Sequence, residues 1–354
     1  MAARSRGGNP CSNSFPLIEN SCCARPRNPA ASTGFPHYRM ETAAAAGCAP
    51  KIGFLRVLQH NTRTRYLVKM DLKSVSSNKS FGGYQKVYEH FSPTLQCTMK
   101  FGIYLPPGVS ENEKCPVLFY LSGLTCTEQN VITKSGFQKY AAQYKIIVVS
   151  PDTSPRNCNI PNEDDKWNVG SGASMYVNAS QEPWNKHYQM FTYITDELHQ
   201  LVLKSFPVIQ DKISIFGHSM GGHGALLCAL LNPGKYKSVS LFAPVCNILN
   251  SPTLIDGLKT LIGEEKETLQ KWDTTCLVKT YDGPEMEILI HVGSDDEFLT
   301  KDLLIDNFVK ATNERKDNKI KTTVFLEDGY DHGYYFISTF IEEHFKFHSS
   351  KLSL

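Results

Sequence analysis

The sequence predicts an α/β fold with a mostly parallel central sheet flanked by helices. Seven short apolar runs end in turn residues, a pattern typical of strands that are buried on both faces of a sheet. Longer amphipathic stretches, such as 182–206 and 223–234, separate several of these runs and predict helices. The expected strands lie within 97–107, 115–123, 144–152, 212–219, 238–245, 287–294 and 322–329.

The composition is that of a globular protein that can bury a core. The chain has 354 residues, of which 41% are hydrophobic and 20% are charged. No apolar run reaches the roughly 18 residues of a membrane span, so no membrane partner is expected. The net charge of +2 is unevenly distributed, because residues 1–70 carry +8 and the rest of the chain carries −6. A net acidic body argues against nucleic acid as the main partner.

Residues 1–69 are predicted to be an extension outside the fold. They are rich in Ala, Ser, Asn, Pro and Arg and poor in acidic residues. This composition suits a transit peptide, or a translated upstream region that is absent from the working protein. Met70 opens a plausible alternative start, and apart from the short run 51–58 we expect no fixed structure before it. Residues 70–354 contain no internal repeat and no second core, so they are expected to form one domain.

The cysteines indicate reduced thiols. Four of the eleven lie in the extension, and the other seven are scattered without a Cys-x-x-Cys pair or a zinc-ligand pattern. An odd number of separated cysteines does not predict a disulfide framework. Reduced thiols in an intracellular protein are the simplest interpretation, and we expect no metal site.

The pattern Gly-x-Ser-x-Gly occurs at Gly217, Ser219 and Gly221. The residues before it predict a strand and those after it a helix, so Ser219 falls at the strand-to-helix junction that a nucleophile elbow requires. The turn is so tight that side chains two positions before and after the serine would collide. Strain lifts the hydroxyl clear of the backbone, at the positive end of the following helix. A chance match in a Gly-rich loop is the alternative, but the surrounding pattern favours a nucleophile.

A nucleophilic serine needs a general base, which follows it along the chain in this kind of fold. His332 is the candidate, because it lies between an apolar strand and an apolar helix. His291 lies within an apolar run and is expected to be a buried strand residue. His344 and His348 lie among Glu and Lys on a terminal helix, where a solvated face is expected. His218 adjoins the serine on a strained backbone and is not expected to act as the base.

The acid that orients the base is expected in the loop after the preceding strand. That loop offers Asp295 and Asp296. Adjacent side chains diverge, so only one of the two can face His332, and the other is a candidate helix cap. Asp331 adjoins His332 and is too close along the chain to orient it well. Spacing alone leaves the choice between Asp295 and Asp296 open.

Acyl transfer to a serine also needs two backbone N–H groups that bind the oxyanion. Met220, the residue after the serine, is expected to supply one of them. The loop after the strand 115–119 is expected to supply the other, from the segment Ser122, Gly123 and Leu124.

Four segments, LSGLTCTEQN, PDTSPRNCNI, IFGHSMGGHGAL and GYDHGYYF, closely resemble the S-formylglutathione hydrolase (esterase D) family. The resemblance covers essentially all of residues 70–354. It implies the α/β-hydrolase fold and a cytosolic serine thioesterase that hydrolyses S-formylglutathione to glutathione and formate, in formaldehyde detoxification. It also implies side activity on small activated esters, no cofactor, and a homodimer.

The resemblance further implies roles for individual residues. The match of 293–299 to the family pattern G-x-x-D-x-F-L selects Asp296 over Asp295. The implied positions are the triad Ser219, Asp296 and His332, the oxyanion donors Leu124 and Met220, and a thiol near the site, Cys126.

Three points stay open at the level of sequence. A generic carboxylesterase, or an acyltransferase in which an alcohol replaces water, is the alternative function. Organellar targeting by residues 1–69 is the alternative to a cytoplasmic location. The residues that grip glutathione are not evident, since Arg156, Trp167 and Trp184 lie in plausible loops where ordinary packing would explain them equally well.

Overall fold

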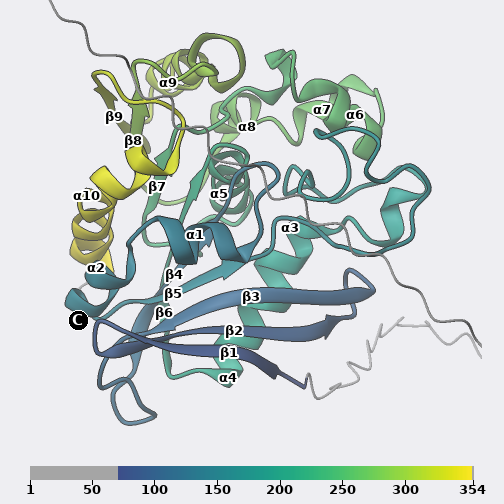
Figure 1. Ribbon diagram of the computed structural model, residues 1–354. Coiled ribbons are helices and arrows are strands. Elements are labelled where there is room, and N and C mark those ends of the chain that lie inside the picture. Colours follow the sequence, from purple (N-terminus) through teal and green to yellow (C-terminus); the bar gives the residue numbers. More distant parts are fainter. Residues whose placement is uncertain (1–70, 353–354) are drawn as a thin grey trace, which may run out of the picture. The chain divides into compact units, whose positions relative to one another are not determined.

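A nine-stranded sheet runs through residues 71–352, the part of the chain that the computed structural model describes (Figure 1). The predicted extension, residues 1–69, lies outside the described residues, so the domain boundary at Met70 stays a prediction. The strand order is β1-β2-β3-β5-β4-β6-β7-β8-β9. The strands are β1 (Lys73–Ser80), β2 (Gly83–Ser92), β3 (Cys97–Leu105), β4 (Cys115–Leu121), β5 (Ile147–Pro151), β6 (Val208–His218), β7 (Val239–Phe242), β8 (Met286–Gly293) and β9 (Ile320–Glu327).

The predicted mostly parallel sheet is confirmed. Strands β5, β4, β6, β7, β8 and β9 pair in parallel, whereas β1, β2, β3 and β5 pair in an antiparallel manner. Strands β1 and β2 are not among the predicted strands. Strand β1 is polar and mostly exposed, and β2 alternates between buried and exposed residues, so neither contains the apolar run of a strand buried on both faces.

Helices and short helical turns cover the sheet and the loops at one end of it (Figure 1). The predicted helix 182–206 is a succession of short helical segments. None of the helices described is long and apolar enough to cross a membrane. The helices are α1 (Glu128–Lys134), α2 (Gln138–Gln143), α3 (Met190–Thr192), α4 (His199–Ser205), α5 (Met220–Leu231), α6 (Ile255–Ile262), α7 (Lys266–Gln270), α8 (Thr274–Thr280), α9 (Ile305–Asn313) and α10 (Tyr334–Leu352); the 3₁₀ and π turns are η1 (Trp184–Lys186), η2 (Tyr193–Leu198), η3 (Ile248–Asn250) and η4 (Leu299–Leu303).

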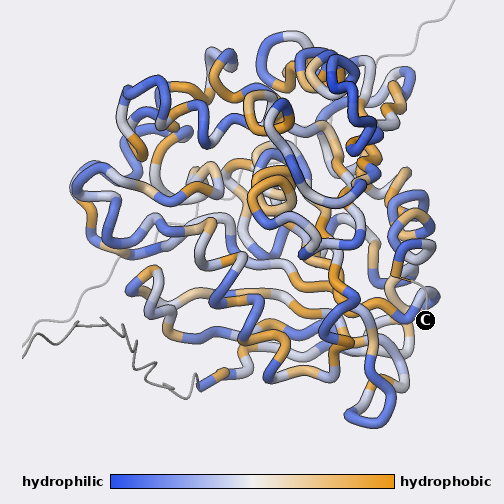
Figure 2. Tube along the Cα trace, turned by 180° about the vertical axis from the view of Figure 1, so that it is seen from behind, coloured by the Kyte–Doolittle hydropathy of each residue, from blue (hydrophilic) through white to orange (hydrophobic). Residues whose placement is uncertain are grey.

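Aromatic residues of β4 and β6 join the sheet to helices on both of its faces. Phe216 of β6 packs edge-on against Phe345 of α10, with ring centroids 6.1 Å apart, and against Tyr120 of β4 at 4.5 Å. Phe119, which alternates with Tyr120 on β4, stacks at 6.2 Å on His199 of α4 on the opposite face. The hydrophobic residues accordingly concentrate in the inner strands and in α5 (Figure 2).

The prediction of a solvated face for His344 and His348 is wrong. Both side chains are buried between α10 and the sheet. The small side chains of Ser240 in β7 and of Ser238 just before β7 leave space there for the imidazole rings. His344 Nδ1 lies 2.7 Å from Ser240 Oγ, and His348 Nδ1 lies 2.8 Å from Ser238 Oγ. His291, predicted to be a buried strand residue, is buried. Its Nδ1 lies 3.0 Å from His344 Nε2. Burial lowers the pKa of His291 to about 4 and that of His348 to about 3, so these rings are neutral core residues.

Candidate active site

The turn between β6 and α5 holds Ser219 in a backbone conformation that L-residues rarely adopt, with φ 57° and ψ −121°. A Cβ atom on Gly217 would lie 2.2 Å from the carbonyl oxygen of Gly221, and one on Gly221 would lie 2.0 Å from that of Leu121. Both contacts are far too short, so only glycine fits two residues before and two residues after the serine. The Ser219 N–H donates to the Phe242 carbonyl at 3.0 Å, which anchors the turn to β7.

Helix α5 supports this turn from inside the protein. Its residues from Met220 to Leu230 are all buried, which explains why the segment is apolar and small on every side. The first N–H groups of the helix face the serine, where their positive potential favours a developing anion.

The loops after β8 and β9 bring Asp296 and His332 together. His332 Nδ1 lies 2.6 Å from Asp296 Oδ2, and the Asp296 side chain is fully buried. Because a carboxylate can only accept, the proton lies on Nδ1, and Nε2 is free to take a proton from another group. The other Asp296 oxygen accepts from the Phe298 N–H at 2.9 Å, so this one residue both caps the turn and faces the imidazole. Asp295 is exposed, and Asp331 accepts a hydrogen bond within its own loop.

Two further side chains fix the His332 ring. His218 is buried, and its ring lies 4.6 Å from that of His332. Burial, with the nearby His332 as a second cause, lowers the pKa of His218 well below its usual value, so its Nε2 is a neutral donor to the His332 carbonyl at 3.1 Å. Phe298 packs edge-on against the His332 ring, with ring centroids 4.9 Å apart. His218 has no predicted role, because its contact with His332 arises only from the fold.

Ser219 and His332 line one cavity of about 300 Å³ together with Leu124 and Met220. Within residues 71–352, the side chains of Ser219 and His332 form no hydrogen bond with each other. In the same part of the chain, the backbone N–H groups of Leu124 and Met220 have no hydrogen-bond acceptor. A Cβ on Gly123 would lie 3.2 Å from that of Ser219, so the glycine keeps space beside the hydroxyl. The cavity therefore places a hydroxyl, an imidazole and two free N–H donors around one volume, which is an arrangement suited to acyl transfer.

Comparison with known proteins agrees with this chemistry. Residues 92–347 match the family model described as putative esterase. The S-formylglutathione hydrolase of Rattus norvegicus is 54% identical over 285 residues, which are 80% of this chain and 100% of the rat protein. The chain belongs to the S-formylglutathione hydrolase family. The family member from Mus musculus is 52% identical over the same share of each chain. The solved S-formylglutathione hydrolase structure from Agrobacterium tumefaciens superposes with a TM-score of 0.76 at 42% identity, covering 79% of this chain and 100% of that one.

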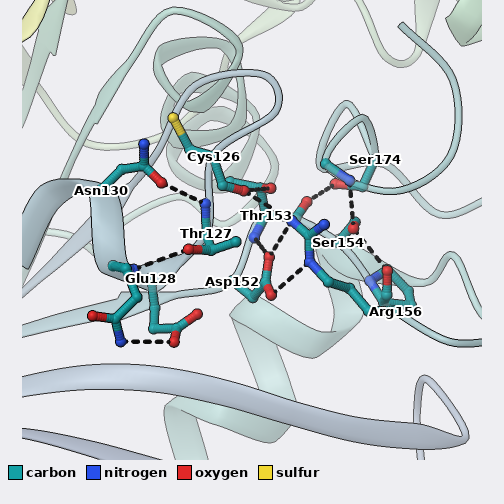
Figure 3. A network of polar contacts seen from close by, with 12 residues as sticks. Cys126, Thr127, Glu128, Asn130, Asp152, Thr153, Ser154, Arg156 and Ser174 are labelled. Carbon is teal, nitrogen blue, oxygen red and sulfur yellow. Dashed lines mark hydrogen bonds and ion pairs between the residues drawn. The ribbon is translucent and has the colours of Figure 1, made fainter. Parts of the chain in front are cut away.

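In this member of the S-formylglutathione hydrolase family, a polar network holds the loop that carries Leu124 (Figure 3). The Cys126 carbonyl accepts from Thr153 Oγ1 at 2.5 Å and from Arg156 Nη2 at 3.0 Å. Arg156 also donates to both carboxylate oxygens of Asp152, at 2.8 and 2.9 Å. The guanidinium thus ties the loop after β5 to the loop after β4.

The three residues considered as candidates for binding glutathione have different surroundings in the structure. Trp184 is buried and packs edge-on against Tyr188 at 5.0 Å, which is ordinary core packing. Arg156 is occupied by the loop network. Trp167 is 58% exposed and is the one of the three that lines the cavity.

Asp302 also lines the cavity, although it is not among the predicted site residues. This buried carboxylate accepts from Ser251 Oγ at 2.5 Å and, through its other oxygen, from Thr253 Oγ1 at 2.9 Å. The Thr253 N–H donates to it as well, at 3.1 Å. No sequence motif marks Asp302, because its partners lie about 50 residues earlier in the chain. Asp302 adds a negative charge to a cavity wall that is otherwise apolar at residues such as Leu254.

The half-buried Cys126 lines the same cavity as the serine. We expect N-ethylmaleimide to inactivate the enzyme, because the added group would occupy space beside Leu124. Burial raises the pKa of the Cys126 thiol, so inactivation should speed up as the pH rises from 7 to 9. Cys126→Ser should keep most of the activity and lose this sensitivity.

Residual activity after timed exposure to N-ethylmaleimide measures the effect. Cys276→Ser is the matched control, since Cys276 is a half-buried thiol that does not line this cavity. Equal inactivation of wild type and Cys126→Ser would assign the effect to another thiol, and no inactivation of either would show that Cys126 is inert.

Proposed function

We propose that this chain is a serine hydrolase that converts S-formylglutathione into glutathione and formate. The observation that carries the proposal is the Asp296–His332 pair, 2.6 Å apart, in the same cavity as the strained Ser219. The 54% identity to the rat S-formylglutathione hydrolase, over the whole of that protein, supports the thioester as the substrate.

In the proposed first step, Ser219 Oγ attacks the formyl carbon while His332 Nε2 takes the hydroxyl proton. Asp296 stabilises the imidazolium that forms, through the proton on Nδ1. The N–H groups of Leu124 and Met220 donate to the oxyanion, and each such donor contributes on the order of 3 kcal/mol to transition-state stabilisation. The C–S bond then breaks, and His332 protonates the departing glutathione sulfur.

In the proposed second step, a water molecule replaces glutathione beside His332. His332 takes a proton from this water, which attacks the formyl carbon of the formyl-Ser219 intermediate. The same two N–H groups bind the oxyanion again. Collapse releases formate, and His332 returns its proton to the Ser219 oxygen.

A comparison of kcat/KM for three substrates tests the choice of substrate. S-formylglutathione should exceed both 4-nitrophenyl acetate and an S-formyl thioester of a small thiol by about 100-fold or more, since contacts to the remote parts of glutathione should be realised in the transition state. The small formyl thioester has the same reacting group, so it isolates the contribution of the peptide portion. Equal values would make the enzyme a generic carboxylesterase, and ester products in the presence of an alcohol would make it an acyltransferase.

We also propose that the protein acts in the cytoplasm as a homodimer. Both proposals rest on the resemblance to the S-formylglutathione hydrolase family. Val324, Phe325 and Leu326 are exposed on β9, the last strand of the sheet order, which is a candidate surface for a second copy.

A further inference from the structure

A buried carboxylate lies in the wall of the cavity that holds Ser219, without a cation beside it. Asp302 belongs to η4 and is 4% exposed. Its oxygens accept from Ser251 Oγ and from the N–H and Oγ1 of Thr253, which are all neutral donors. Within residues 71–352, Asp302 forms no ion pair. Burial of a carboxylate without a cation costs free energy, and a cation bound in the cavity would reduce that cost.

The Asp302 carboxylate has room for one more hydrogen-bond donor. Its two oxygens offer about four lone-pair sites. Oδ1 accepts from Ser251 Oγ at 2.5 Å and from the Thr253 N–H at 3.1 Å, whereas Oδ2 accepts from Thr253 Oγ1 at 2.9 Å. Oδ2 therefore keeps one site, and a molecule bound in the cavity can use it.

The rest of the cavity wall also favours a positive group. Among the described residues that line the cavity, Asp302 is the one carboxylate, and none is Lys or Arg. Trp167 lines the same cavity, and the face of an indole ring attracts cations. Asn168 Nδ2 donates to the Thr253 carbonyl at 2.7 Å, which ties the loop carrying Trp167 to the residue that holds Asp302. This wall attracts an ammonium group and repels a carboxylate.

We propose that Asp302 is a specificity-determining residue that binds the α-ammonium group of the γ-glutamyl residue of S-formylglutathione. The inference rests on the proposed function, because it names the part of that substrate which the cavity wall selects. S-formylglutathione carries one ammonium group and two carboxylates. Only the ammonium group matches the charge of Asp302, so the two carboxylates should lie away from this wall.

The contact would act on binding and orientation and not on the chemical step itself. The ammonium group is remote from the formyl carbon, and Asp302 has no part in the proton transfers of the proposed mechanism. A hydrogen bond between two charged groups in a buried wall would hold the peptide portion in one position and thereby orient the thioester toward Ser219. Loss of the contact should therefore lower kcat/KM for substrates that carry the ammonium group.

Two substrates that differ only in the ammonium group test the inference. In the desamino analogue of S-formylglutathione, a glutaryl group replaces the γ-glutamyl group and both carboxylates remain. For wild type, kcat/KM should be about 10-fold or more higher for S-formylglutathione than for the analogue. In Asp302→Asn this ratio should fall to about one, because the amide carries no charge. A purely structural role of Asp302 would not change the ratio.

The Asp302→Asn variant should fold, since its amide oxygen can still accept from Ser251 Oγ and the Thr253 N–H, and a thermal midpoint checks this. If it does not fold, Asp302→Gln removes the same charge, and the cavity leaves space for the longer side chain. Asp306→Asn is the matched control, because Asp306 is an exposed carboxylate of α9 that does not line this cavity. It should keep the ratio of wild type.

The possible outcomes separate this inference from the proposed function. Equal kcat/KM of wild type for the two substrates would overturn the inference and leave the proposed function standing. A preference for the ammonium group that persists in the folded Asp302 variant would overturn the role of Asp302. Hydrolysis of neither substrate by wild type would refute the proposed function, and the inference with it.

Discussion

Ser219→Ala is expected to lower kcat for thioester hydrolysis by about 10⁴-fold or more. The proposed mechanism passes through a formyl ester on this oxygen, and alanine removes it. The φ of 57° is set by the two flanking glycines, and alanine keeps the same Cβ, so the elbow should fold as before. Steady-state kinetics, with a thermal midpoint to show that the variant is folded, measure the effect.

The matched control is Ser338→Ala on the exposed side of α10, which should leave kcat unchanged. A fluorophosphonate should label wild type and Ser338→Ala, but not Ser219→Ala. Because the hydroxyl and the imidazole act as a unit, Ser219→Ala combined with His332→Ala should be scarcely slower than Ser219→Ala alone. A Ser219→Ala protein that retained more than about 1% of the activity would rule out the serine as the nucleophile.

Asp296→Asn should have the next largest effect, lowering kcat by about 10⁴-fold. An asparagine amide can donate to His332 Nδ1, which would hold the proton on Nε2 and remove the base. The change is structurally mild, because the remaining amide oxygen can still accept from the Phe298 N–H. Its consequence should therefore appear in kcat and not in the thermal midpoint.

Asp295→Asn is the matched control for this experiment. Asp295 is the neighbouring carboxylate, exposed and hydrogen-bonded to Ser294 Oγ, so its substitution should change kcat by less than about threefold. If Asp295→Asn were the crippling change and Asp296→Asn the mild one, the assignment of the acid would be wrong.

The inner sheet could be predicted from the sequence because the parallel strands β4, β5, β6, β7 and β8 each contain an apolar run that is buried on both faces. The elbow could be predicted as well, because the steric demand on Gly217 and Gly221 is local. The polar strand β1 could not, since its partner β2 and not its own composition makes it a strand. The choice between Asp295 and Asp296 needed either the family pattern or the turn geometry, because the two residues are adjacent and their spacings from His332 differ by only one position.

Features that depend on partners far away along the chain could not be predicted from the sequence. The burial of His344 and His348 rests on two serines about 100 residues earlier, which no helical pattern reveals. Asp302 and its partners Ser251 and Thr253 likewise lie in segments that only the folded chain brings together.

The parallel strands β4, β6, β8 and β9 have a consequence for when the protein becomes active. The loop carrying Leu124 follows the first of these strands, and the loop carrying His332 follows the last, so more than 200 residues separate them. A ribosome-bound chain would contain Ser219 long before His332, its proposed base, had been synthesised. Without that base the serine would be a poor nucleophile over that interval. Its reactivity toward esters would begin only when β9 pairs with β8 and α10 packs on the sheet. Esterase activity is therefore a signal of completed folding, and a prematurely ended chain would release no reactive nucleophile.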